Sequence, residues 1–422
     1  MPESGTNRRI EAIWRIESPR LIASLTRTTR DVGIAEELAQ DAFVAALQQW
    51  PQEGTPDNPG AWLMATARRR GIDRARRDRR LRGIEEELQR DREPAAAAPH
   101  AKVDERLDGA IDDDVLRLLF TTCHPALSPD ARIALTLRLL CGLCTDEIAR
   151  AFLVPEPTIA QRIVRSKRTL ADEHVAFEVP HGEALAERLS SVLAVIYLVF
   201  NEGYSATAGE DWMRPALCDE AIRLGRILAA QMPQQPEVQG LVALMEIQAS
   251  RIKARTDGAG RPILLLDQNR ALWDHLLIRR GLAALELAER SGAPRGPYTL
   301  QAAIAACHAR ARTGAETDWP RIKALYGELA TLTPSSVVEL NRAIAIAMAD
   351  GPDAGLRHID TIAGDPQLQG YHLLPSVRGD LLFRLGRLGE AREEFLCAAG
   401  LTRNERERAV LLERAAACAP QS

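Results

Sequence analysis

Cationic and hydrogen-bonding side chains recur at helical spacing in one short stretch of the chain, residues 156–168. Presented by a helix, such side chains can reach base edges and phosphates in the major groove of duplex DNA. The alternative is a solvated basic helix in an ordinary helical bundle, and the stretch alone does not decide between them. The residues expected to contact DNA here are Glu156, Thr158, Gln161, Arg162, Arg165, Lys167 and Arg168.

Two short helices joined by a tight turn are needed to position this stretch. Thr145 is a good N-cap, and the acidic residues that follow it would face the positive end of the helix dipole. Pro155 and Pro157 fit the turn and the start of a second helix, because proline is tolerated in a first turn but breaks a helix interior. The stretch from Cys144 to Leu170 therefore predicts a helix-turn-helix. The apolar face of its second helix should comprise Ile159, Ile163, Val164 and Leu170.

A second cationic stretch lies earlier in the chain, where nine arginines and two aspartates fall between Arg68 and Arg82. A helix beginning near Ala61 would surround a narrow apolar face with arginine. Because each arginine that meets a phosphate releases counterions, this helix is expected to bind nucleic acid at least non-specifically. Trp62 could be a core anchor or a platform on which unpaired bases stack. The residues expected to contact DNA here are Trp62, Arg68, Arg69, Arg70, Arg74, Arg76 and Arg77.

An acidic face precedes the arginine-rich stretch, on a helix predicted over residues 31–50. Its members are Glu36, Glu37, Gln40 and Asp41. The pattern fits an ordinary solvated surface, and it also fits a face that docks on a basic partner helix. The residues alone leave both interpretations open.

Other residues with chemical potential are few. A cluster that could bind a small molecule or a peptide is expected in a loop and comprises Asn201, Glu202, Tyr204 and Trp212. Cys307 and His308 are adjacent on a predicted helix, so they point about 100° apart and cannot readily act as nucleophile and base. The sequence contains no Gly-rich phosphate loop, HExxH or GxSxG. We expect neither an enzyme nor a bound cofactor.

Cys141 and Cys144 form a CxxC, with Cys123 and His124 upstream, so a zinc site or a redox switch has to be considered. No second pair has the usual zinc-finger spacing, and we expect no metal and assign no role to the CxxC. The seven cysteines, an odd number scattered through apolar segments, indicate free thiols in a reducing compartment.

The composition of the 422-residue chain predicts an all-α protein, because 46% of the residues are hydrophobic, only 4% are aromatic and alternating β-type runs are nearly absent. The longest apolar run, Val192 to Phe200, is far shorter than the roughly 20 residues of a membrane-spanning helix. The N-terminus lacks a signal-peptide pattern, so a cytoplasmic location is expected. The net charge of −4 hides the local basic stretches described above.

Composition shifts predict three domains and two linkers. These are a first helical domain (8–82), a linker (83–110), the domain with the helix-turn-helix (111–173), a second linker (174–181) and a helical array (182–418). In the array, Leu373 to Leu401 is similar to a tetratricopeptide repeat, with Gly386 at the turn and Ala391 where two helices approach closely. Helices are predicted at about 182–202, 214–232, 236–254, 269–291, 297–312, 318–332, 335–349, 353–363, 370–386, 388–399 and 404–417.

The first 173 residues resemble the extracytoplasmic-function (ECF) sigma factors of the sigma-70 family. Three stretches carry the resemblance, in the family's order and on both sides of a linker: AEELAQDAFVAALQQW, NPGAWLMATARRRGIDRARR and VPEPTIAQRIVRSKRTL. The remainder resembles the tetratricopeptide-like extension of one subgroup, in stretches such as NEGYSA, WMRPALCDEAIRLGR and VVELNRAIA. The sequence departs from the family's pattern at CGLC.

The resemblance implies a role for each stretch. The acidic helix would dock on core RNA polymerase, the arginine-rich helix would melt and capture the promoter's minus-ten element, and the helix-turn-helix would read the minus-thirty-five element. The expected function is therefore promoter-specific transcription initiation, with a C-terminal domain that binds the sigma domains, a regulator or polymerase. A helix-turn-helix transcriptional regulator with a helical ligand-sensing domain is the alternative, but it leaves residues 31–50 and 68–82 unexplained.

Overall fold

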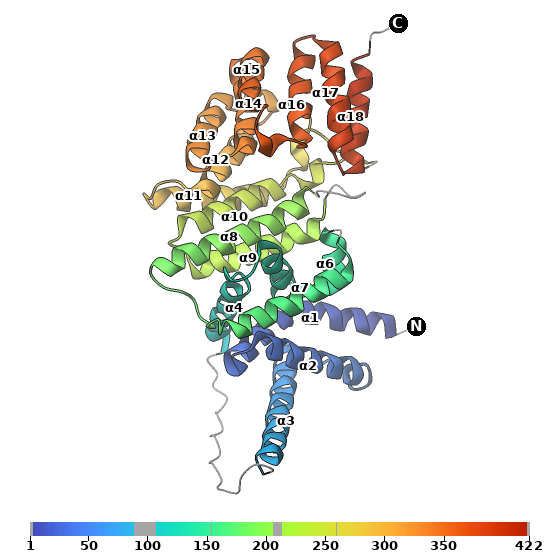
Figure 1. The fold of residues 1–422 in the computed structure, drawn as a ribbon, viewed down its shortest axis with the longest axis vertical. Helices are drawn as coiled ribbons and strands as arrows, with labels where there is room; N and C mark the ends of the chain where they lie inside the picture. The colour runs from blue at the N-terminus through green and yellow to red at the C-terminus, as the bar shows by residue number, and fades with distance from the viewer. Residues whose placement is uncertain (1–2, 88–106, 153, 206–212, 259, 420–422) are drawn as a thin grey trace. The chain divides into compact units, whose positions relative to one another are not determined.

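The computed structural model describes residues 3–87, 107–152, 154–205, 213–258 and 260–419. Within these ranges the chain forms eighteen α-helices and four short 3₁₀ helices and no β-strand, apart from one isolated bridge between Thr256 and Pro262. The prediction of an all-α fold is confirmed (Figure 1). None of the helices in the described ranges is long and apolar enough to cross a membrane.

The chain divides into two compact units, residues 1–195 and 196–422. The helices of the first unit are α1 (Glu3–Thr29), α2 (Val32–Glu53), α3 (Pro59–Glu87), α4 (Leu107–Thr122), α5 (Pro129–Leu140), α6 (Thr145–Phe152), α7 (Glu156–Asp172) and the beginning of α8 (Glu183–Tyr204). Two of these helices extend into the range 83–110, where the composition predicts a linker. The domain limits given above remain predictions.

Local side-chain chemistry sets where the helices of the first unit begin. Asp31 caps α2 by accepting a hydrogen bond of 2.9 Å from the backbone N–H of Ile34, and Asn58 accepts one of 3.0 Å from Ala61 at the start of α3. Ser128 caps α5, with Pro129 in the first turn. The helix α1 continues across Pro19, although proline usually breaks or kinks a helix interior.

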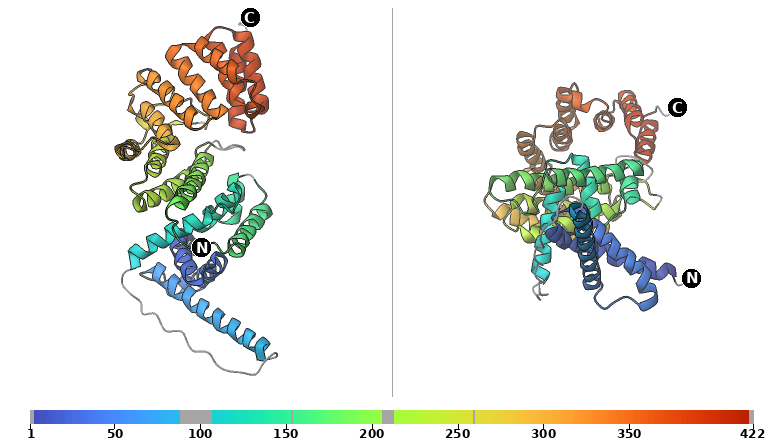
Figure 2. Two further views of the ribbon diagram at one scale, coloured as in Figure 1. Left: turned by 60° about the vertical axis from the view of Figure 1, so that its left-hand side comes forward. Right: turned by 60° about the horizontal axis from the view of Figure 1, so that its bottom comes forward.

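The arginine-rich helix α3 packs against α1 and α2 with only its first part. Leu63 and Ala67 are buried there, whereas the side chain of Ile72 is 55% exposed. Figures 1 and 2 show the rest of α3 extending away from α1 and α2. The apolar face that the sequence predicts for α3 includes Ile72. This residue is exposed because its neighbour Gly71 faces Leu38 of α2, and adjacent helical residues point about 100° apart.

The second unit is a succession of helices that pack on the next or the next-but-one helix in the sequence (Figure 2). Its helices are the end of α8, α9 (Pro215–Gln231), α10 (Pro236–Ala249), α11 (His275–Arg290), α12 (Pro297–Arg310), α13 (Trp319–Leu332), α14 (Ser336–Asp350), α15 (Pro352–Ile362), α16 (Leu373–Arg384), α17 (Leu388–Leu401) and α18 (Glu405–Ala417). Short 3₁₀ helices lie at Ile252–Ala254, Arg270–Leu272, Gly314–Glu316 and Pro366–Leu368. All eleven helices predicted between residues 182 and 417 are present, with bounds that differ by a few residues.

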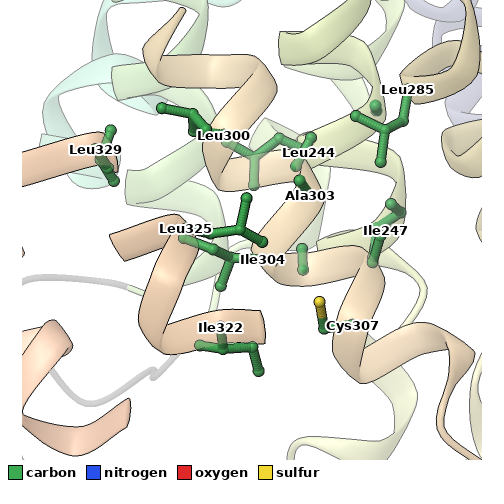
Figure 3. Packing of buried hydrophobic residues seen from close by; sticks show 14 of the residues in the cluster. Leu244, Ile247, Leu285, Leu300, Ala303, Ile304, Cys307, Ile322, Leu325 and Leu329 are labelled. Carbon is green, nitrogen blue, oxygen red and sulfur yellow. The ribbon is translucent and has the colours of Figure 1, made fainter. Parts of the chain in front are cut away.

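Two large apolar clusters hold the second unit together. The larger joins α10, α11, α12 and α13, where Leu300 and Leu325 are fully buried between neighbouring helices (Figure 3). In the other cluster α16 and α17 approach so closely that a Cβ atom on Gly379 would lie 2.9 Å from the Phe395 ring. Gly386 adopts φ 74° in the turn between these helices and Ala391 is fully buried, as the repeat-like pattern predicts. Assignment to the tetratricopeptide family itself remains a prediction.

Candidate nucleic-acid and partner interface

The helix-turn-helix prediction corresponds to α6 and α7. The carboxylate of Glu147 accepts a 2.9 Å hydrogen bond from the backbone N–H of Cys144 and so ties down the start of α6. Ile159, Ile163 and Leu170 bury the inner face of α7. Val164 is 64% exposed, so its expected place on the apolar face is wrong. Val164 cannot share the inner face with Ile163, because adjacent helical residues point about 100° apart and Ile163 is buried there.

The residues of α7 predicted to contact DNA fall into two groups. Those that are exposed are Glu156, Thr158, Gln161, Arg165 and Arg168. Arg162 is partly buried and lies 3.2 Å from a carboxylate oxygen of Asp130, whereas the Lys167 ammonium contacts the carboxylate of Glu36. The first group can meet a nucleic acid directly, and the second must first give up an ion pair with the protein.

The arginines of α3 are divided in a similar way. Arg68, Arg69 and Arg76 are exposed. Arg70 lies 3.4 Å from Asp41, and Arg74 donates to Glu37, so both arginines pair with the acidic face of α2. The side chain of Arg77 lies outside the described residues.

Trp62 packs on another aromatic residue of the first unit. Its ring meets the buried Trp50 edge to face, with the ring centroids 5.3 Å apart and the planes at 67°. This contact favours the core-anchor interpretation of Trp62, although the side chain is only half-buried.

The acidic face of α2 is exposed at two residues and buried at a third. The side chains of Glu37 and Asp41 are 60% and 57% exposed, and their ion pairs with arginines of α3 stabilise the fold little because water screens them. Glu36 is 2% exposed. Gln40 is half-buried and donates a 2.6 Å hydrogen bond to Glu36.

Glu36 joins α2 to the helix-turn-helix half of the unit. Its Oε1 atom accepts a 2.8 Å hydrogen bond from Arg138 Nε of α5, and Lys167 of α7 contacts Oε2. Two further ion pairs connect α1 to the same half: Arg15 with Glu147, and Arg27 with Asp114 at 3.3 Å. Burial raises the pKa of the Asp114 carboxyl, and the charges of Arg27 and Arg117 oppose that shift. We call these four ion pairs the interdomain clasp: Glu36 with Arg138, Glu36 with Lys167, Arg15 with Glu147, and Arg27 with Asp114.

The clasp includes residues that the sequence reasoning missed. Arg138 is the only charged residue in the run IALTLRLL of α5, and a lone cation in a buried apolar helix is a signal that it has a charged partner. Asp114 stands in a run of three aspartates, and nothing in the sequence distinguishes it from the other two.

The cluster expected in a loop after residue 200 lies mostly on a helix, so that expectation is wrong. Asn201, Glu202 and Tyr204 belong to the last turn of α8, because its apolar sequence carries the helix further than the polar residues suggest. Glu202 is buried and pairs with Arg214, and the Tyr204 ring stacks on Phe200 at a centroid distance of 5.6 Å. Trp212 lies outside the described residues.

The cysteines of the CxxC differ in environment. Cys141 is buried, and Cys144 is exposed with its Sγ donating a hydrogen bond to Glu147. Partial burial and the neighbouring carboxylates raise the pKa of the Cys144 thiol to about 12, so thiolate is scarce at neutral pH. Among the described residues, no three His, Cys, Asp or Glu side chains are grouped so that they could hold a metal ion.

Comparison with known proteins identifies three segments. The profile described as Sigma-70 region 2 matches residues 13–81, that of Sigma-70, region 4 matches residues 117–170, and a family of unknown function (DUF6596) matches residues 188–289. The two sigma segments contain the acidic helix, the first part of the arginine-rich helix and nearly all of the helix-turn-helix. No solved structure matches the chain significantly.

Relatives match either the whole chain or its first unit. An uncharacterized protein of Rhizobium meliloti (strain 1021) is 45% identical over 395 residues, which is 93% of this chain and 92% of that protein. The ECF RNA polymerase sigma factor SigK of Mycobacterium sp. (strain KMS) is 32% identical over 156 residues, which is 36% of this chain and 76% of that protein. The ECF RNA polymerase sigma factor SigC of Mycobacterium tuberculosis (strain CDC 1551 / Oshkosh) is 28% identical over 169 residues, covering 39% of this chain and 83% of that protein. The chain therefore belongs to the ECF RNA polymerase sigma factors.

Proposed function

We propose that this sigma factor docks on core RNA polymerase through the acidic face of α2 and contacts promoter DNA through α3 and α7. The observation that carries the proposal is the exposed set of polar and cationic side chains on α7, held by a buried inner face in the segment that matches region 4. Phosphate contacts from the arginines would supply most of the affinity, and Thr158, Gln161 and Arg165 would meet base edges.

The polymerase contact would be made mainly by Glu37, Gln40 and Asp41. The exposed ion pairs of Glu37 and Asp41 with α3 are weak, so these carboxylates can exchange their arginines for cations of a partner at little expense in free energy. Docking would free Arg70 and Arg74 for the minus-ten strand. Glu36 could join the interface only after the clasp has opened.

Transcription with purified components tests the proposal. Adding the protein to sigma-free core polymerase should give run-off transcripts from a cognate promoter fragment, and replacing Glu37 and Asp41 with lysine should abolish them. The matched control replaces Asp57 and Glu178 with lysine and should leave the transcripts unchanged, since both are exposed acids of the first unit outside α2, α3 and α7. DNA binding without association with core polymerase would refute the proposal and favour a conventional regulator.

We further propose that the second unit regulates the first. Similarity to the Rhizobium meliloti protein extends over nearly the whole of both chains, so the two units occur together in a relative. The partner of the second unit would be the sigma domains, a separate regulator or polymerase. Promoter output from the full chain should differ from that of a chain ending at residue 195, and equal output would remove the regulatory role. The proposal places the protein in the cytoplasm, with polymerase, and gives it no catalytic activity.

A further inference from the structure

Three cationic side chains and a histidine are buried together in the second unit. Arg251, Arg255 and His308 are 8%, 6% and 8% exposed, and Arg270 is partly buried. They come from three elements, since Arg251 and Arg255 flank the 3₁₀ turn after α10, Arg270 begins the next 3₁₀ turn and His308 lies near the end of α12. The position of Arg270 is fixed, because its Nη1 donates hydrogen bonds to the carbonyl oxygens of His308 and Ala311.

Arg251 is the least compensated of these groups. Its guanidinium carbon lies 5.8 Å from the ring centroid of Tyr204 and 5.9 Å from that of Trp273. Among the described residues, none accepts a hydrogen bond from its side chain, and its Nε atom is buried without a partner. Stacking on aromatic rings recovers only part of the hydration that a guanidinium loses on burial. A buried cation in this state favours the binding of an anion.

Further hydrogen-bonding groups without partners lie close to Arg251. Arg270 lies over the same Trp273 ring, 4.6 Å from its centroid, so two guanidinium groups share one indole. Arg270 Nη2, His308 Nδ1 and Trp273 Nε1 are each buried without a hydrogen-bond partner among the described residues. Burial and the charges of Arg251 and Arg270 lower the pKa of His308 to about 4, so this imidazole is neutral at pH 7 and adds a hydrogen-bonding group without adding charge.

Neither Arg251 nor Arg270 has a carboxylate partner among the described residues. No ion pair in the described part of the chain joins Arg251 or Arg270 to a carboxylate, and Glu316 acts on Arg270 only through its long-range field. Native proteins rarely leave several buried polar groups unpaired in one place unless the site has a use. The cluster differs in this respect from Arg226 nearby in the sequence, which pairs with the buried Glu246 at 2.7 Å.

We propose that Arg251, Arg270 and His308 form a binding site for the carboxylate or phosphate group of a small anionic ligand, flanked by the aromatic rings of Tyr204 and Trp273. A planar guanidinium can donate two parallel hydrogen bonds to either group, and the low polarity of a buried site strengthens such bonds. Apart from His308, these residues fall within the segment that matches the family of unknown function. The site does not depend on the proposed contacts with polymerase or promoter.

Calorimetric titration of the full-length protein tests the site, with inorganic phosphate in one arm and succinate in the other, each against sodium chloride at equal ionic strength. We expect saturable binding of phosphate or of succinate, and binding at least tenfold weaker in R251M. The anion that binds identifies the ligand group as a phosphate or a carboxylate. The matched control R290M removes an exposed arginine of α11 that pairs with Glu286 of the same helix, and it should bind as the wild type does.

A thermal melt in ligand-free buffer separates a binding role from a structural one. R251M should melt at or above the wild-type temperature, because it removes an uncompensated buried charge, and should not respond to the anion. If R251M does not fold, anion binding is measured with R251K instead. This variant keeps the positive charge but loses the planar guanidinium, and it is expected to bind the anion at least tenfold more weakly than the wild type. Absence of saturable binding, or binding equal in wild type and the Arg251 variant, would overturn the proposal.

A carboxylate of the chain itself is the competing occupant. Glu210 and Asp211 lie outside the described residues, and the double variant E210Q/D211N removes both. Anion binding seen only in this variant and dependent on Arg251 would mean that the chain satisfies its own site, and the proposed external ligand would be wrong. Binding that is already present in the wild type supports the proposal.

Discussion

Replacing Arg138 with methionine should make the free factor bind core polymerase more tightly. Arg138 holds Oε1 of Glu36 at 2.8 Å, and Glu36 is a predicted polymerase contact that is only 2% exposed while the clasp is closed. R138M removes one of the two cations that hold Glu36, without altering any residue assigned to polymerase or DNA. The gain in affinity should therefore report the free energy needed to open the clasp.

The size of the effect follows from the burial of the pair. Breaking a buried ion pair by removing one partner costs roughly 3–5 kcal/mol. Lys167 remains on the carboxylate in the variant and the side chain of Arg138 is 23% exposed, so we expect about 2 kcal/mol. Since 1.4 kcal/mol corresponds to a factor of ten, the apparent affinity for core polymerase should rise by up to about 30-fold. The full gain is reached only if the clasp is closed in nearly all of the free wild-type protein.

Fluorescence anisotropy of labelled protein titrated with core polymerase measures this change, and hydrogen exchange in α2 and α5 reports whether the clasp has opened. Two controls are available. R150M removes an exposed arginine that pairs with Asp146 of its own helix, so it should bind as the wild type does. E36Q also breaks the clasp, but it loses a proposed polymerase contact and should gain less. Faster exchange in R138M without tighter binding would refute the reasoning.

Three further outcomes are expected. A chain ending at residue 195 should melt at a higher temperature than one ending at residue 173. The shorter chain lacks Ser191, whose hydroxyl donates a 2.7 Å hydrogen bond to the backbone carbonyl of Cys123. Equal melting temperatures in calorimetry would contradict this. Replacing exposed Arg165 with alanine should reduce the salt slope of promoter binding by about 1, and an unchanged slope in filter binding would exclude a phosphate contact. Alkylation of Cys144 at pH 8 should be several-fold faster in E147Q, because losing the carboxylate lowers the thiol pKa from about 12; equal rates by mass spectrometry would count against that cause.

The helices could be predicted from the sequence because caps, prolines and apolar periodicity are local signals. Asp31 and Ser128 cap helices where their types indicate. The errors occur where tertiary packing decides. Ile72 is apolar yet exposed, since no pattern within α3 shows which of its sides faces α2. Tyr204 is helical although the polar residues beside it suggest a loop.

The candidate interfaces were predictable in composition but not in pairing. The sequence indicates that α2 is acidic and that α3 and α7 are basic. It cannot show that Arg70 and Arg74 pair with α2 while Glu36 pairs with α5 and α7, because those contacts depend on how helices far apart in the chain pack. The cation cluster around Arg251 was missed for the same reason, since its members are separated in sequence and no spacing rule connects them.

The clasp links the two proposed binding activities. Glu36, a predicted polymerase contact, is held by Lys167, a predicted DNA contact, so neither side chain can meet its outside partner while the ion pair persists. A polymerase surface that binds the Glu36 carboxylate would release Lys167. A DNA phosphate that binds Lys167 would leave Glu36 buried with one cation fewer. Because coupling between two binding sites is reciprocal, core polymerase should raise the affinity for promoter DNA by the same factor as DNA raises the affinity for polymerase. Both factors should shrink together in K167M, in which neither partner has this ion pair to break.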